Sequence, residues 1–495
     1  MSLRIERGAF VRLRSLLANG APKFVHDFAI LSSGQFASKL IGLVVFAMLA
    51  RALDPEGYGA LEYVVGLTAF FVTAVECGLG TIGVKRIARA REELPALAAE
   101  IPLARLAVAI LAIPLMIAGV EVFGSPAIPS GLVWLYAASL LFTALNQEWV
   151  LQSSELMAEV VVAQTLRALV FATVVFLFVR SSADLTAVGF AELGAVAVAS
   201  IYCLWQQHIK VTPVRFSFSI PRMAVLVREG TSVGLSHLVW AAAQFMPLFL
   251  LGSIVGAAHV GLFAAAQRLV MSLSTFSFVY HFNLYPSLTR AAAESNDELA
   301  NLLRLSFRVT AWVSIGCALG FALAADPILT SIYGGRFEVG APALAILVWV
   351  VPVIFLSGHA RWLLIVSDKQ RCVLHAQIAG LVTIVLVGGP LILYFRDVGA
   401  ACTAVIGSIV VWIVSHWLAL RLKARPPDFF LFVKPLMLAL VLGLAIQFAE
   451  VGLLVKAVGG FILYVLAAPL VDRELVRDTV RLAHAKATAV PPRQP

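Results

Sequence analysis

The chain has 495 residues, of which 61% are hydrophobic and 13% are charged. Soluble domains are about 45–50% apolar and about 25% charged, so this composition excludes a cytoplasmic enzyme, a disordered chain and a secreted disulfide scaffold. A polytopic membrane protein remains. The 37 lysines and arginines exceed the 28 acidic residues and give a net charge of +9. In a membrane protein this excess indicates basic cytoplasmic loops, not a nucleic-acid partner.

The first 26 residues form a basic, amphipathic segment. Arg4, Arg7, Arg12 and Arg14 alternate there with apolar side chains. This pattern predicts an interfacial helix on the cytoplasmic face of a membrane and does not fit a cleavable signal peptide.

Apolar stretches of membrane-spanning length follow one another along the rest of the chain. They predict an all-α polytopic membrane protein with about fourteen transmembrane helices. The expected spans are residues 27–50, 60–82, 102–121, 131–151, 160–180, 185–205, 230–253, 260–284, 306–325, 341–365, 372–394, 399–420, 431–448 and 452–471.

The basic residues predict the orientation of these spans. An even number of spans puts both termini on one side, and most basic residues then fall in the tails and loops of that side. The opposite side carries Arg51, Arg180, Arg336 and Arg396. Since cytoplasmic loops are enriched in lysine and arginine, both termini are expected in the cytoplasm.

The expected spans contain an internal repeat. The sequence of residues 28–92 can be aligned with that of residues 230–294. Two parallel repeats of six spans would place a substrate cavity between the halves. The predicted organisation is a basic cytoplasmic N-segment (1–26), a first lobe (27–208), a basic linker (209–229), a second lobe (230–425), two further helices (426–471) and a basic cytoplasmic tail (472–495).

No catalytic, metal or cofactor site is expected. The longest outward loop, residues 326–340, has no obvious catalytic set, and the sequence has no P-loop, HExxH or GxSxG motif in a suitable context. The five cysteines lack metal-ligand spacing and are interpreted as small core residues. A carrier, channel or scramblase remains.

Four blocks of sequence carry a family resemblance. They are residues 31–59, which contain Asp54-Pro-Glu-Gly-Tyr-Gly, residues 149–157, residues 256–286, and Ile332-Tyr-Gly-Gly-Arg-Phe. In this order, over about residues 28–425, they resemble the Wzx-type flippases of lipid-linked oligosaccharides in the multidrug/oligosaccharidyl-lipid/polysaccharide exporter superfamily.

The resemblance implies a V-shaped, two-lobed helical bundle that works by alternating access in the bacterial inner membrane. It would move an undecaprenyl-diphosphate-linked saccharide to the outer leaflet for exopolysaccharide, O-antigen or capsule assembly. Its expected partners are this substrate, the lipid bilayer, and candidate polymerase and chain-length proteins. Many relatives carry an acid in the seventh span, where this chain has Gln244, so their ion coupling does not transfer to this position.

Basic residues inside the spans are the candidate substrate-binding groups. Lys39 lies near the middle of the first span, and Arg268, Arg167 and Arg361 lie in later spans. Fixed cations lower the electrostatic cost of moving a diphosphate through a low-dielectric slab, and arginine can hold phosphate by two hydrogen bonds. Alternatively, Arg105, Arg361 and Lys434 reach the cytoplasmic edge as snorkelling side chains.

Three acids inside the spans, Glu76, Glu148 and Glu192, are candidates for ion coupling or for pairing with these cations. Two rival functions stay open: a cation-coupled multidrug-type antiporter of the same superfamily, and a membrane polysaccharide polymerase. The antiporter should have about twelve spans and acids near a small cavity, and the polymerase should have a large catalytic outward loop. A membrane scaffold would leave the charged residues within the spans unexplained.

Overall fold

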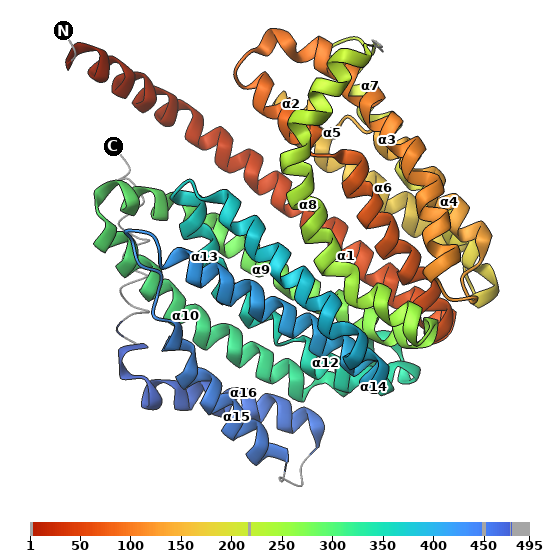
Figure 1. Cartoon of the computed structure of the whole chain (residues 1–495), viewed down its shortest axis with the longest axis vertical. Coiled ribbons are helices and arrows are strands. Elements are labelled where there is room, and N and C mark those ends of the chain that lie inside the picture. Colours follow the sequence, from red (N-terminus) through yellow and green to blue (C-terminus); the bar gives the residue numbers. More distant parts are fainter. Residues whose placement is uncertain (1–2, 216–218, 448–451, 476, 478–495) are drawn as a thin grey trace. The chain divides into compact units, whose positions relative to one another are not determined.

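The computed structural model describes the backbone of residues 3–215, 219–447, 452–475 and 477. It describes the side chains in these ranges from residue 38 onward, except those of residues 220, 447, 453 and 454. Every regular element in these ranges is a helix (Figure 1). A helix satisfies all its backbone hydrogen bonds internally, which a segment surrounded by lipid requires. The prediction of an all-α chain is confirmed.

The elements follow one another in this order: α1 (Leu3–Glu76), α2 (Leu79–Ile87), η1 (Arg91–Glu93), α3 (Leu94–Phe123), α4 (Ser130–Ala144), α5 (Glu148–Ser153), α6 (Met157–Phe178), η2 (Ser182–Asp184), α7 (Leu185–Lys210), α8 (Ile220–Ile254), α9 (Ala257–Glu294), α10 (Asn296–Leu323), α11 (Ala325–Tyr333), η3 (Gly335–Gly340), α12 (Ala341–Leu347), α13 (Val350–Val366), α14 (Gln370–Ala419), η4 (Phe429–Phe432), α15 (Val433–Gln447) and α16 (Leu453–Val471).

Ten helical stretches among the described residues are long and apolar enough to cross a membrane. Two of them, Ser38–Ile87 and Gln370–Ala419, each contain two predicted spans, because α1 and α14 are interrupted by non-helical backbone at Asp54 and Arg396. Two further predicted spans coincide with helix α4 and with helix α16, whose described apolar part is short. The polytopic membrane fold is therefore confirmed.

The chain forms two compact units. Unit 1 comprises residues 1–53, 67–122 and 129–238, and unit 2 comprises residues 54–66, 123–128 and 239–495. Within unit 1, α7 packs against α4 and α6. Within unit 2, α13 packs against α9, α10 and α14, and α16 packs on α10 (Figure 1). The first half of the chain thus contributes two short segments to unit 2.

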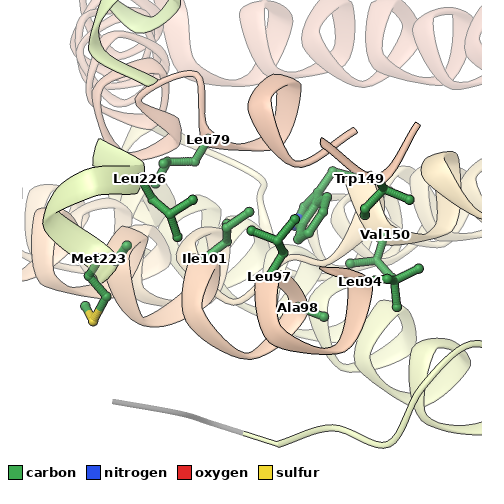
Figure 2. Close-up of a cluster of buried hydrophobic side chains, with 11 residues drawn as sticks. Leu79, Leu94, Leu97, Ala98, Ile101, Trp149, Val150, Met223 and Leu226 are labelled. Atoms are coloured by element: carbon green, nitrogen blue, oxygen red, sulfur yellow. The ribbon is translucent and has the colours of Figure 1, made fainter. Parts of the chain in front are cut away.

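A buried apolar cluster fixes α5 in unit 1 (Figure 2). Trp149 of α5 packs there with Ile101 of α3, Leu79 of α2 and Leu226 of α8. Gly83 provides the room for the indole, because a Cβ atom at this position would lie 2.4 Å from Cζ3 of Trp149. The block around Trp149 that carried part of the family resemblance is therefore a core element of this unit.

Two equivalent turns of the predicted repeat contact each other reciprocally in unit 2. Each turn begins at a residue with positive φ, Asp54 (58°) and Gly256 (116°). A Cβ atom at Gly59 would lie 1.8 Å from the carbonyl oxygen of Ala257, and a Cβ atom at Gly261 would lie 2.0 Å from that of Pro55. In the sequence alignment of the repeat, Gly59 corresponds to Gly261. This exchange of equivalent contacts is the arrangement expected of two related hairpins.

Helix α16 is anchored to α10 by hydrogen bonds at Trp312. The Tyr464 hydroxyl donates to the Trp312 carbonyl oxygen at 3.2 Å, and the Trp312 indole donates to Oδ2 of Asp472 at 3.2 Å. Asp472, which is buried, also lies 3.8 Å from both Arg308 and Lys434. The first residue after α16 therefore has a fixed place in the fold of unit 2.

Candidate functional site

A buried ion pair in unit 2 joins Arg268 of α9 to Glu62 of α1. The Arg268 guanidinium donates to Oε1 of Glu62 from Nη2 at 2.6 Å and from Nε at 2.9 Å. The two side chains are 24% and 8% exposed. Burial of an ion costs several kcal/mol, so the two charges depend on each other. Arg268, expected as a cation for substrate phosphate, is thus held by a carboxylate.

Three aromatic side chains surround this pair. The Tyr58 ring packs edge-on against Phe337 at 5.7 Å between centroids, and Tyr333 lies 5.7 Å from Phe337. Burial raises the pKa of the Tyr333 phenol, so it stays protonated. Three of the segments that carry the family resemblance, at residues 54–59, 261–269 and 332–337, therefore meet in one buried cluster, which we call the outer clasp. It comprises Tyr58, Glu62, Arg268, Tyr333 and Phe337.

A second ion pair lies in unit 1 between neighbouring helices. Nη2 of Arg167 in α6 lies 2.6 Å from Oε1 of Glu192 in α7, and the two side chains are 52% and 14% exposed. The sequence predicted Arg167 as a candidate phosphate ligand and Glu192 as a candidate for ion coupling or pairing. The structure brings these two residues together, and the carboxylate offsets the charge of Arg167.

Glu148 stands at the start of α5 and is held by side-chain amides. Its Oε1 accepts hydrogen bonds from Nε2 of Gln164 at 2.6 Å and from Nε2 of Gln152 at 3.1 Å. Its backbone N–H donates to Oδ1 of Asn146 at 2.9 Å. An acid in the first turn of a helix also interacts favourably with the helix dipole. Glu148 is therefore fixed in position without a direct ion pair among the described residues.

Arg105 is buried in α3, with 5% of the residue exposed. Its Nη1 donates to the Asn146 carbonyl oxygen at 3.1 Å, and a Cβ atom at Gly80 would lie 2.8 Å from its Nη2. The prediction that Arg105 snorkels to the cytoplasmic edge is therefore wrong. The charges that act on this guanidinium are those of Glu76 and Glu148.

Five charged residues of unit 1 lie close enough for their charges to act on one another, and two of them, Arg167 and Glu192, form an ion pair. We call this group the inner charge network and define it as Glu76, Arg105, Glu148, Arg167 and Glu192. It contains three acids and two arginines, so its formal charge is negative. A negative site attracts a cation or a proton more readily than a phosphate. The sequence predicted four of its members as candidate site residues. It did not predict Arg105, because a residue near the end of a span was expected to be exposed.

Arg361 of α13 has a different environment in unit 2. Its guanidinium carbon lies 5.2 Å from the centre of the Phe278 ring of α9. Such cation–π contacts stabilise a cation without neutralising it. No acidic partner of Arg361 occurs among the residues that the structure describes, and Phe278 is itself exposed. Within the described part of the chain, the charge of Arg361 is therefore not offset by a carboxylate.

Lys39 and Glu76 lie near the two ends of the described side-chain part of α1. Both side chains are exposed. The structure places Glu76 in the electrostatic surroundings of Arg105 and Glu148. Lys39 remains a candidate cation.

Next to Arg361, unit 2 contains a chain of buried polar groups that the sequence did not predict. The Tyr280 hydroxyl lies 2.7 Å from Oγ of Ser306, which lies 2.8 Å from Nε2 of His359. His359 and His281 pack edge-on at 4.9 Å between ring centres. Helical spacing alone does not indicate such a chain.

The fold is that of a polytopic helical membrane protein with charged side chains inside its spans, and comparison with known proteins places it among membrane transporters. The model of a family described as "Polysaccharide biosynthesis protein" matches residues 24–292, more than half of the chain. The chain belongs to this family.

Two curated proteins are similar in sequence. A protein of Escherichia coli (strain K12) named "Putative O-antigen transporter" is 20% identical over 377 residues, which cover 74% of this chain and 90% of that protein. A protein of Shigella dysenteriae with the same name is 21% identical over 281 residues, covering 56% and 69%.

Solved structures confirm the fold. The inward closed conformation of the lipid II flippase MurJ superposes with a TM-score of 0.71 at 13% identity, covering 90% of this chain and all of that chain. An inward-facing multidrug resistance transporter of the MATE family, in the MOP superfamily, gives a TM-score of 0.63 at 15% identity, covering 77% and 93%. At these identities the likeness establishes the fold alone.

Proposed function

We propose that this protein moves an undecaprenyl-diphosphate-linked saccharide from the cytoplasmic to the outer leaflet of the bacterial inner membrane by alternating access. The family is one of polysaccharide biosynthesis, and the name of the Escherichia coli relative refers to O-antigen transport. The observation that carries the proposal is Arg361, a cation inside the apolar span region that keeps its charge for an anionic ligand.

Arg361 suits a diphosphate for three reasons. It has an aromatic neighbour in place of a carboxylate, so no carboxylate competes with a phosphate for it among the described residues. Its guanidinium can donate two parallel hydrogen bonds to phosphate oxygens. It lies within about two turns of the end of its span that is expected to face the cytoplasm, where the substrate would enter. The exposed Phe278 ring beside it offers an apolar surface for a sugar or for the lipid chain.

The other candidate cations fit this role less well. Arg268 and Arg167 each have a carboxylate within hydrogen-bond distance, so each pair carries no net charge. A phosphate would have to displace that carboxylate, and breaking the existing ion pair would offset most of the free energy gained by binding. Lys39 is exposed and remains the second candidate, as a point charge for the same phosphates.

The inner charge network suits ion coupling. Its three acids outnumber its two arginines, and Glu148 and Glu76 act on the same guanidinium. Binding of a proton or a metal cation near these acids would reduce their mutual repulsion. We infer that a cation gradient drives transport through this network.

Complementation tests the substrate-binding role. The variants Arg361→Ala, Arg361→Lys and Arg371→Ala are expressed in a strain that lacks its own transporter, and surface polysaccharide is measured together with the amount of inserted protein. Arg371 is the matched control, because it is an exposed arginine at the start of α14. We expect Arg361→Ala to lose export, Arg361→Lys to keep part of it and Arg371→Ala to keep all of it. Full export by Arg361→Ala would overturn the assignment.

A further inference from the structure

Three connections of unit 1 meet around a cavity of about 300 Å³. They are the segment around Arg91 between α2 and α3, the segment around Ser154 between α5 and α6, and the segment that follows Lys210 at the end of α7. The complete lining consists of Arg91, Leu94, Pro95, Ser154, Leu156, Lys210, Val211 and Thr212. In the predicted orientation all three connections face the cytoplasm. We propose that this cavity binds the phosphate group of an anionic lipid headgroup.

The cavity is lined by two basic residues: Lys210, which an acidic neighbour holds in place, and Arg91, which is exposed. Lys210 donates to Oε1 of Glu159, which also accepts a hydrogen bond from the Tyr202 hydroxyl at its other oxygen. An ammonium group has three donors, so Glu159 offsets the charge of Lys210 but positions it and leaves two donors for a ligand. Arg91 is exposed, and no ion pair of Arg91 occurs among the described residues. The acids that follow it are Glu92 and Glu93, and Glu93 is paired with Arg86 at 3.5 Å.

A hydroxyl group completes the donor set. Oγ of Ser154 is buried and has no hydrogen-bond partner within the described part of the chain. An unmade hydrogen bond of a buried hydroxyl costs about 1–3 kcal/mol, and a phosphate bound beside Ser154 would accept it once the side chain turns into the cavity. The cavity thus combines the charge of Arg91 with two further donors, the Lys210 ammonium and the Ser154 hydroxyl, and its volume accommodates a phosphate group.

The apolar lining of the cavity and its expected place on the cytoplasmic side favour a lipid over a free phosphate ion. Leu94, Pro95, Leu156 and Val211 line the same cavity, so an apolar glycerol and acyl region would have a matching surface. Basic pockets between transmembrane helices on the cytoplasmic side commonly bind anionic headgroups. The site is separate from Arg361 and from the inner charge network, so it does not depend on the proposed transport activity.

Lipid binding to the full-length protein in detergent tests the proposal by native mass spectrometry and thermal unfolding. The probes are phosphatidic acid, the matching diacylglycerol without phosphate, and inorganic phosphate. The proteins are the wild type, Arg91→Ala, Ser154→Ala and the control Arg89→Ala. Arg89 is also exposed and lies two residues from Arg91, but it does not line the cavity.

We expect phosphatidic acid to bind the wild type and Arg89→Ala equally, and Arg91→Ala about tenfold more weakly, because a charge-assisted hydrogen bond is lost. Ser154→Ala should bind several-fold more weakly, and diacylglycerol should not compete. Stabilisation of the wild type but not of Arg91→Ala by inorganic phosphate alone would support the phosphate site and assign it to free phosphate. Wild-type affinity in both Arg91→Ala and Ser154→Ala, or equal binding of diacylglycerol, would overturn the proposal.

Discussion

The Arg268 guanidinium donates two hydrogen bonds to a single oxygen of Glu62, at 2.6 and 2.9 Å. Because both side chains are largely buried, Arg268→Ala leaves a carboxylate without its counter-charge. Such a loss destabilises by about 3–5 kcal/mol. We therefore expect a clearly lower unfolding temperature of the purified protein in detergent, and partial recovery in the exchanged double variant Glu62→Arg with Arg268→Glu.

Arg336→Ala is the control for this experiment, since Arg336 is exposed in the connection that follows α11. An unfolding temperature for Arg268→Ala equal to that of Arg336→Ala would contradict a structural role of the outer clasp.

The reciprocal contact of Gly59 and Gly261 predicts that neither position tolerates a side chain. A Cβ atom would come within 1.8 or 2.0 Å of a backbone oxygen, and backbone cannot move aside as a side-chain end can. Overpacking costs about 1–3 kcal/mol and occasionally more. Gly59→Ala and Gly261→Ala should therefore yield little monodisperse protein. Gly42→Ala, where a Cβ would meet no atom within 4 Å, should purify like the wild type.

Asp472 predicts a local effect on the C-terminal helices. It accepts from the Trp312 indole and is close to two cations, so Asp472→Ala removes a buried acceptor and leaves its partners unsatisfied. The expected cost is about 1–3 kcal/mol. Hydrogen exchange should accelerate in α16, while α6 and α7 keep their protection. Unchanged exchange in α16 would show that Asp472 does not anchor this helix.

Glu148 tests the ion-coupling role of the inner charge network. In Glu148→Gln the polar contacts with Gln152 and Gln164 can be replaced, so the protein should fold, but the negative charge is lost. We expect the variant to lose the extra transport that an ion gradient drives. Exchange of substrate down its own concentration gradient should persist. Glu294→Gln, at an exposed position at the end of α9, should respond to the gradient like the wild type. A full gradient response in Glu148→Gln would exclude Glu148 from coupling.

The positions of the spans could be predicted from the sequence because apolar length is a local property. Both interrupted helices agree with this: the predicted breaks after residues 50 and 394 fall close to Asp54 and Arg396. The turn at Asp54 is also determined by neighbouring residues. The Asp54 carboxylate accepts a hydrogen bond from the Gly57 N–H at 2.9 Å, and Pro55 begins the next helical segment.

The partners of the embedded charges could not be predicted in the same way. Arg268 was expected to bind the substrate, yet it is bound to Glu62, which lies 206 residues away in the sequence. Arg105 was expected at the membrane edge, but the absence of a side chain at Gly80 gives it a buried site. Such pairings depend on which helix faces pack together, and hydropathy is insensitive to this.

Transport of a defined undecaprenyl-diphosphate-linked oligosaccharide in proteoliposomes tests the central claim most directly. The appearance of the glycan on the far leaflet is followed for the wild type, Arg361→Ala and protein-free vesicles, together with an analogue on neutral undecaprenol. The account predicts rapid movement by the wild type, at least about tenfold slower movement by Arg361→Ala, and no movement of the analogue, because the phosphates provide the recognition. Movement no faster than in protein-free vesicles under any ion gradient, or equal movement of the phosphate-free analogue, would contradict it.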